Sequence, residues 1–272
     1  MTATTLPSPA LRPRRRSALA WVIADTKTIT WRNLVTLRRL PQLLVFSTIQ
    51  PVIFVLMFRY VFGGSIHIPG VDYVNYLMPG IFAQTVTFGA IQTGIGLAED
   101  LHKGLIERFR SLPMARAAVL AGRTLADLVR NVFVVALMLV VGYMVGFRVE
   151  TSVLGLLAGV AVILLFGFSL TWIFAIIGLS APNAETAQAM SFPILAPLVF
   201  VSSAFVAIDT MPGWMQPFAK YQPVSVAVDA VRSLMLGGQF HDTSKVLGSL
   251  AWSIGIVAVF APLAVRVYRR TA

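Results

Sequence analysis

The chain has 272 residues, of which 57% are hydrophobic and only 12% are charged, and its mean hydropathy is +0.79. Soluble domains carry about 25% charged residues, so this composition excludes an ordinary water-soluble globule and predicts an all-α integral membrane protein. The net charge of +11 suggests cationic loops that orient the chain in a membrane, and we expect no nucleic-acid partner.

The absence of cysteine excludes disulfides and thiol chemistry. The three histidines, His67, His102 and His241, are far apart along the sequence. We therefore expect each to be a solvated loop residue, and we predict no metal site in this chain.

The first forty residues are basic and contain no long apolar run. Residues 1–16 hold three prolines and four arginines, which predicts a disordered basic tail. The next long apolar run begins only near Leu43, so we expect a retained tail and not a cleaved leader. Residues 17–40 have a helical period, with leucine and valine on one side and Arg32 and Arg39 on the other. This pattern is typical of an amphipathic helix at the membrane interface.

Six apolar runs follow within residues 41–272, and each is long enough to cross a hydrocarbon core of about 30 Å. The predicted spans cover about residues 43–62, 73–97, 125–147, 153–179, 187–207 and 246–265. Most of the 22 lysines and arginines lie inside if the amino terminus is cytoplasmic. The positive-inside rule then predicts a multi-pass plasma-membrane protein with both ends in the cytoplasm.

The inside connection, residues 98–124, is too long for a plain loop. Glu99 and Lys103 are spaced for an i,i+4 ion pair, and the pattern predicts that the second span continues as an amphipathic helix until Pro113 stops it. A second short helix, about 115–121, then leads into the third span. Such a charged helix suits docking on a cytoplasmic partner, and a solvated hairpin without a partner fits the pattern equally well.

The outer connection, residues 208–245, is apolar but interrupted by prolines. Its second part, about 224–236, has a helical period and is too short to cross the membrane. Asp229 and Arg232 are spaced i,i+3 and are expected to form a structural ion pair. An exposed pair on a surface loop is the alternative.

The third span contains charged residues near its cytoplasmic end. Asp127 lies between Arg123 and Arg130 on one helix face. Charges at membrane depth are costly and usually face protein. We predict structural ion pairs that anchor this end of the span, and a proton or ion relay is the alternative.

Spans two and five carry semi-polar and aromatic residues at helical spacing. Aromatic faces with a few amides suit a flat or lipidic amphiphile, whereas polar residues that join neighbouring helices are the alternative. The candidate substrate pathway comprises Gln84, Thr85, Phe88, Gln92, Phe192 and Phe200.

The order of these features resembles the type-2 permeases of ATP-binding-cassette (ABC) exporters, in particular the daunorubicin-resistance-like branch. The matching inside motifs are Glu99, Lys103-Gly104, Glu107-Arg108, Leu112-Pro113 and Gly122. The matching outer motifs are Met211-Pro212, Trp214, Gln216, Gln222-Pro223, Asp229-Ala230, Arg232 and Gly237. Many relatives carry Asn-Pro in place of Gln222-Pro223, which is a mild departure. The resemblance covers roughly residues 25–268.

The resemblance implies a division of labour. The chain has no GxxxxGK[ST] phosphate loop, so ATP and Mg are expected on a separate nucleotide-binding ATPase subunit, and the chain itself is neither an enzyme nor a holder of a cofactor. The other implied partners are a second permease, identical or paralogous, and membrane lipid. The family also implies a coupling helix at 114–121 supported by 99–112, a re-entrant outer hairpin, and a pathway between two permeases. The candidate coupling residues are Glu99, Lys103, Glu107, Arg108, Phe109, Pro113 and Arg116.

The branch implies export of a hydrophobic drug, a lipid or a glycolipid, and polysaccharide export is the alternative. A secondary transporter would show inverted repeats or acidic residues at the middle of the spans, and the sequence shows neither. A membrane scaffold would need neither a coupling connection nor a re-entrant segment.

Overall fold

The computed structural model describes residues 18–39, 41–64, 66, 68–105 and 116–271, and these residues form helices and connections without a strand. The long helices are α1 (Ala18–Arg39), α2 (Pro41–Leu56), α3 (Tyr73–His102), α5 (Arg116–Val145), α6 (Val153–Ser180), α7 (Ala184–Phe200), α9 (Pro223–Met235) and α10 (Thr243–Thr271). The short ones are the π-helical η1 (Met57–Phe62), η2 (Ile208–Thr210), α8 (Gln216–Tyr221) and η3 (Gly238–Phe240). Among the described residues, α3, α5, α6 and α10 are long and apolar enough to cross a membrane. The predicted all-helical membrane fold is confirmed at this level.

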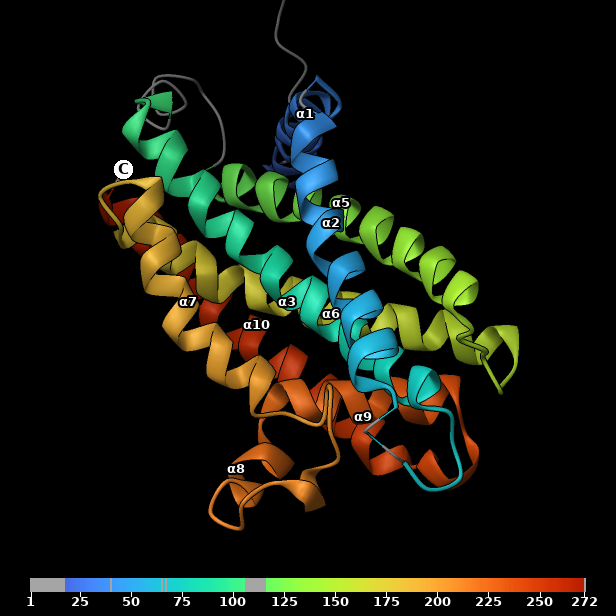
Figure 1. Cartoon of the computed structure of the whole chain (residues 1–272). Coiled ribbons are helices and arrows are strands. Elements are labelled where there is room, and N and C mark those ends of the chain that lie inside the picture. Colours follow the sequence, from blue (N-terminus) through green and yellow to red (C-terminus); the bar gives the residue numbers. More distant parts are fainter. Residues whose placement is uncertain (1–17, 40, 65, 67, 106–115, 272) are drawn as a thin grey trace, which may run out of the picture.

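Helix α3 lies at the centre of the bundle and packs against α2, α5, α6, α7 and α9 (Figure 1). Its closest neighbour is α6, where Gly94 and Gly178 face each other. A Cβ atom added to Gly178 would overlap the carbonyl oxygen of Gly94, so the two backbones are in contact. Small residues at such a crossing allow the close van der Waals packing that joins helices in a membrane.

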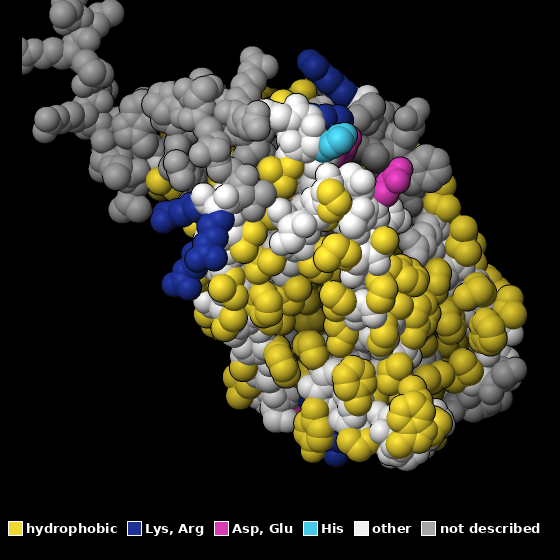
Figure 2. Space-filling model, turned by 90° about the vertical axis from the view of Figure 1, so that its left-hand side faces the viewer, with side chains coloured by type: hydrophobic (Ala, Val, Ile, Leu, Met, Phe, Trp, Pro, Cys, Tyr) yellow, Lys and Arg dark blue, Asp and Glu magenta, His cyan; other side chains and the backbone are white. Residues whose placement is uncertain are grey.

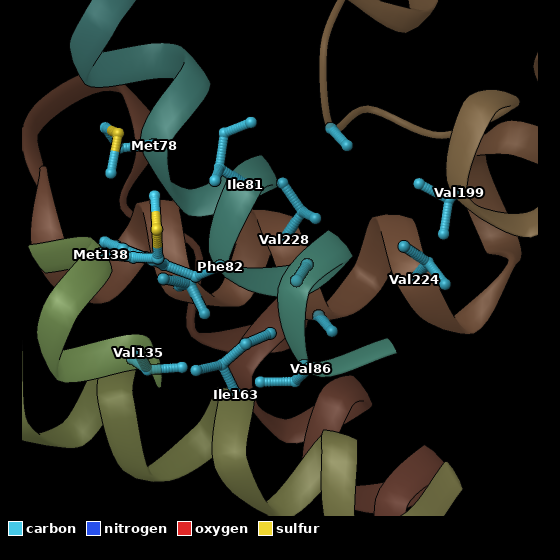
Figure 3. Close-up of a cluster of buried hydrophobic side chains, with 14 of the residues drawn as sticks. Met78, Ile81, Phe82, Val86, Val135, Met138, Ile163, Val199, Val224 and Val228 are labelled. Atoms are coloured by element: carbon cyan, nitrogen blue, oxygen red, sulfur yellow. The ribbon is translucent and has the colours of Figure 1, made fainter. Parts of the chain in front are cut away.

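The largest group of buried apolar side chains surrounds the amino-terminal part of α3 (Figure 3). Helices α3, α5, α6, α7 and α9 all contribute to it, which joins segments from most of the chain. The labelled members are Met78, Ile81, Phe82, Val86, Val135, Met138, Ile163, Val199, Val224 and Val228.

Helix α1 and the carboxyl end of α10 lie at the same end of the molecule, and α8 and α9 lie at the opposite end (Figure 1). Figure 2 shows one face, on which hydrophobic side chains cover the middle and charged side chains gather mainly toward one end. An apolar middle with charged side chains displaced toward an end is the distribution expected of a protein that crosses a bilayer.

Helix α1 is attached to the bundle through α5. Ile29 is buried, and a Cβ atom added to Gly122 of α5 would overlap its side chain. The hydroxyl of Thr30 donates a hydrogen bond to the carbonyl oxygen of Gly122 at 3.2 Å. Ile23 of α1 is exposed, and Nη2 of Arg32 lies 3.8 Å from the carboxylate of Asp100 on α3. The placement of this helix at the membrane interface stays a prediction.

The second span does not extend to Pro113 as one amphipathic helix. Helix α3 ends at His102, and Gly104 has a φ of +66°, a left-handed conformation that glycine adopts readily and that often follows a helix end. Residues 106–115 lie outside the described part of the chain. The predicted short helix before the third span is not separate, since α5 runs without a break from its first residue to Val145.

The fifth predicted span, 187–207, is helical only as far as Phe200, because α7 ends there and residues 201–206 form turns. The amide of Gln222 donates hydrogen bonds to the carbonyl oxygens of Leu198, at 2.8 Å, and Val201, at 3.0 Å. This side chain satisfies carbonyls that the end of a helix leaves free. Because Gln222 belongs to a later segment of the chain, the sequence of the fifth span alone did not reveal that the helix ends at Phe200.

Candidate functional site

A cavity of about 370 Å³ lies between α1, α2, α3 and α5. It extends along α3 from Gln84 to Glu99 and along α5 from Arg123 to Val134. Its polar lining comprises Asn33, Thr36, Ser47, Gln50, Gln84, Thr85, Gln92, Glu99, Arg123, Asp127, Arg130 and Asn131. So many polar groups around one cavity between largely apolar helices mark a candidate binding site.

The predicted stripe on the second span lines this cavity. Gln84, Thr85, Phe88 and Gln92 all contribute to its wall. Gln84 and Thr85 are buried, and the hydroxyl of Thr85 donates to the carbonyl oxygen of Ile81 at 2.7 Å. The structure therefore brings together the four pathway residues that the sequence placed on this helix.

The two predicted pathway residues of the fifth span lie elsewhere. Phe192 and Phe200 are about half exposed on α7 and do not line the cavity. The ring of Phe192 lies 6.5 Å from that of Phe88, and the ring of Phe200 stacks on Phe205 at 5.9 Å between centroids. The six predicted residues thus divide between the cavity and an outward aromatic face.

Asp127 is the centre of a buried charge cluster on the cavity wall. Its carboxylate lies 3.2 Å from Nη1 of Arg130 and 3.7 Å from Nε of Arg123. The hydroxyl of Thr93 on α3 donates to it at 2.6 Å, and Nη2 of Arg130 donates to the carbonyl oxygen of Gly89 at 2.7 Å. A buried ion pair is tolerated only when its remaining hydrogen-bonding groups are satisfied. The cluster therefore ties α5 to α3.

The same cluster continues through Asp100 toward α1. Nη1 of Arg123 lies 3.2 Å from one carboxylate oxygen of Asp100, and Nη2 of Arg32 lies 3.8 Å from the other. Three helices are thus linked by alternating charges. The sequence alone did not indicate Asp100, Thr93 or Arg32 as site residues, because their partners lie on other helices and no spacing within one helix reveals them.

The predicted coupling residues lie mostly outside the described part of the chain, which omits Glu107, Arg108, Phe109 and Pro113. Arg116 begins α5, but its side chain is also outside the described part. Glu99 and Lys103 form an exposed ion pair at 2.6 Å. The hydrogen bond from Lys103 to Glu99 raises the pKa of the lysine.

A second buried charge, Arg232 of α9, lies at the opposite end of the bundle. Its Nε and Nη2 atoms donate to the carbonyl oxygen of Tyr76, and Nη2 also donates to that of Ser203 at 2.6 Å. Its guanidinium stacks 3.6 Å from the ring centroid of Tyr76 and lies 3.1 Å from Asp229, which also approaches Lys245 at 3.5 Å. With Arg232 only 2% exposed, the alternative of an exposed pair on a surface loop is wrong.

Comparison with known proteins agrees with the resemblance drawn from the motifs. A family described as ABC-2 type transporter matches residues 24–236. The chain is 40% identical over 255 residues to the daunorubicin resistance ABC transporter permease protein DrrB1 of Streptomyces coeruleorubidus, covering 93% of this chain and 89% of that one. It is 28% identical over 267 residues to the probable doxorubicin resistance ABC transporter permease protein DrrC of Mycobacterium tuberculosis, covering 97% and 95%. A match to the doxorubicin resistance permease DrrB of the same organism covers 66% and 61% at 28% identity.

Proposed function

Because this chain belongs to the ABC-2 type transporter family, in the branch of the daunorubicin resistance permeases, we propose that it is the membrane-spanning subunit of an ATP-driven drug exporter. The observation that carries the proposal is the similarity to a drug-resistance permease along nearly the whole of both chains. The substrate class that this relative indicates is a hydrophobic drug, and lipids or glycolipids share the amphiphilic character that the site requires.

The exporter would place six helical segments across the membrane. Besides α3, α5, α6 and α10, these would be α2 continued by η1, and α7 with the turns after Phe200. Helix α1 would lie at the inner interface, and α8 with α9 would form the re-entrant outer hairpin. The position of α1 and the end of α10 at one end of the molecule supports an even number of crossings (Figure 1).

Reporter fusions test this topology in the plasma membrane. A reporter that works only outside the cell is expected to be active after residue 66 and near residue 220. It is expected to be silent near residue 108 and at the carboxyl terminus. Activity at residue 108 would overturn the topology and the coupling role of the inner connection with it.

ATP would be bound and hydrolysed by two separate ATPase subunits, which would dock on the inner connections of two permeases. The charge cluster from Asp127 through Arg123 to Asp100 and Arg32 supports this, because it links the connection ends of α3 and α5 to α1. A movement of that connection would therefore be transmitted to α1, α3 and α5 together.

Variants of the connection test the docking. Glu107→Ala and Arg116→Glu are expected to weaken ATPase binding about ten- to a hundredfold, as loss of a charged interfacial hydrogen bond does. Arg148→Glu changes an exposed arginine just beyond the other end of α5 and serves as the control. Pull-down of the cognate ATPase measures the effect. Normal ATPase binding and full export by both connection variants would show that this segment is only a solvated loop and has no docking role.

Drug movement would use Phe88 with Phe192 and Phe200, at a contact between the two permeases. The exposed aromatic face of α7 beside Phe88 supports this placement. Phe88→Ala or Phe192→Ala is expected to change the relative export of a drug panel from vesicles while the ATPase stays bound. Phe133→Ala removes an equally exposed ring from α5 and is expected to leave the preference unchanged.

A further inference from the structure

Two buried amides on the cavity wall have unsatisfied hydrogen-bonding atoms. Gln84 on α3 and Asn131 on α5 are each 2% exposed and line the cavity. The Oε1 atom of Gln84 and the Nδ2 atom of Asn131 have no hydrogen-bond partner in the described structure. Burying such groups without partners costs free energy, so a pair of them on one cavity indicates a ligand that satisfies both.

The two atoms require opposite partners. Oε1 of Gln84 accepts a hydrogen bond, and Nδ2 of Asn131 donates one. Asn131 packs against Gly89, where an added Cβ atom would overlap the asparagine oxygen. Gly89 follows Gln84 by five residues, which is about 7.5 Å along the axis of α3. Because one atom accepts and the other donates, a ligand that satisfies both amides carries a donor and an acceptor.

The charged groups of the cavity are already paired. Asp127 is neutralised by Arg123 and Arg130, and the second terminal nitrogen of Arg130 is bound to the backbone of α3. Glu99 forms its ion pair with Lys103. A charged ligand would have to separate one of these pairs, so the cavity favours an uncharged polar group.

The rest of the wall is apolar. Leu34 of α1, Phe88 and Ile95 of α3 and Val134 of α5 line the cavity beside the amides. A wall that combines amides with apolar side chains suits an amphiphile, which has a polar head and an apolar body.

We propose that this cavity binds the uncharged, hydroxyl-bearing head of an amphiphile. One hydroxyl donates to Oε1 of Gln84, and a second one accepts from Nδ2 of Asn131. Hydroxyls suit both positions because each is a donor and an acceptor, as on a sugar or another polyol. The proposal rests on the proposed function in that the occupant would be a substrate held before transport, but binding itself requires neither ATP nor the ATPase.

The test compares three fluorescent amphiphiles with the same ten-carbon dansyl tail and different heads: a glucoside, a trimethylammonium and a sulfate. Each is titrated into the full-length chain in nanodiscs, with empty nanodiscs subtracted. The glucoside is expected to bind saturably and at least tenfold more tightly than either charged probe. Equal affinity for the three heads, or no saturable binding of the glucoside, would overturn the proposal without the need for any variant.

Variants then locate the site. Gln84→Met and Asn131→Leu are each expected to weaken glucoside binding about three- to tenfold, as loss of one neutral hydrogen bond does. Gln188→Met makes the same change at an exposed position of α7 that does not line the cavity, and is expected to bind as the wild type does. Unchanged affinity in both cavity variants would show that the glucoside binds elsewhere and that water suffices for the two amides.

The outcomes separate this inference from the proposed function. Drug export with the ATPase but no glucoside binding would overturn the cavity site alone. Glucoside binding by a chain that assembles with no ATPase would overturn the exporter alone.

Discussion

Replacing Arg232 by methionine removes the charge that holds α9 against α3. The guanidinium makes hydrogen bonds to the carbonyl oxygens of Tyr76 and Ser203, an ion pair with Asp229 and a stacking contact with the Tyr76 ring. Each charged hydrogen bond contributes about 1.5–3 kcal/mol, but bonds from one group do not add independently. Removing one partner of a buried ion pair costs about 3–5 kcal/mol, and Lys245 still compensates part of the Asp229 charge. We therefore expect a loss of about 3–5 kcal/mol.

For a chain of this length, that loss corresponds to a fall in Tm of about 10 °C. Thermal unfolding of the detergent-purified chain, followed by tryptophan fluorescence, measures it. The Tm of Arg232→Lys is expected to lie between those of the wild type and Arg232→Met, because an ammonium keeps the charge but lacks the planar fork that reaches two carbonyls. Arg266→Met, at an exposed position of α10, is expected to stay within about 2 °C of the wild type. An Arg232→Met protein that melts with the wild type would refute the structural role of this arginine.

Three further outcomes are expected. Gly178→Leu should abolish monodisperse protein in size-exclusion chromatography, because its side chain would overlap the backbone of α3, whereas Gly255→Leu meets open space and should be tolerated; equal yields would contradict the close helix contact. Thr93→Val should lower the free energy of unfolding by about 1.5–3 kcal/mol through loss of the hydrogen bond to Asp127, and an unchanged denaturation midpoint would contradict that bond's contribution. The purified chain alone should release no phosphate from ATP above background, and robust turnover would remove the permease-only assignment.

The sequence predicted the helices well where long apolar runs define them. The predicted fourth span corresponds closely to α6, and the predicted sixth span lies within α10, because a long apolar run defines each of them. The ends of other helices depended on distant partners. The amide of Gln222 donates a hydrogen bond to a carbonyl oxygen at the end of α7. The end of α3 is followed by Gly104 in a left-handed conformation. A helical period alone contains neither piece of information.

The candidate site shows the same division between local and distant information. Spacing within one helix predicted that Asp127 would lie beside Arg123 and Arg130, because residues three and four apart share a face. It did not predict Asp100 or Asn131, whose positions at the cavity follow from how α3 packs against α5. The rotation of one helix about its axis relative to another is set by side-chain packing over the whole bundle.

The enclosure of α3 has a consequence for how the chain is made. Of the four long apolar helices, α3 is the least hydrophobic and the most enclosed, with 78% of its apolar segment buried, against 17% for α10. Its polar side chains are shielded by α5, α6 and α9, all of which are synthesised after it. A nascent chain that ends soon after α3 therefore exposes Gln84 and Thr93 to lipid with few protein neighbours, and polar groups at membrane depth oppose insertion. Stable integration of α3 is expected to wait until α5 and α6 have left the ribosome, so the centre of the finished bundle would be among the last helices to settle.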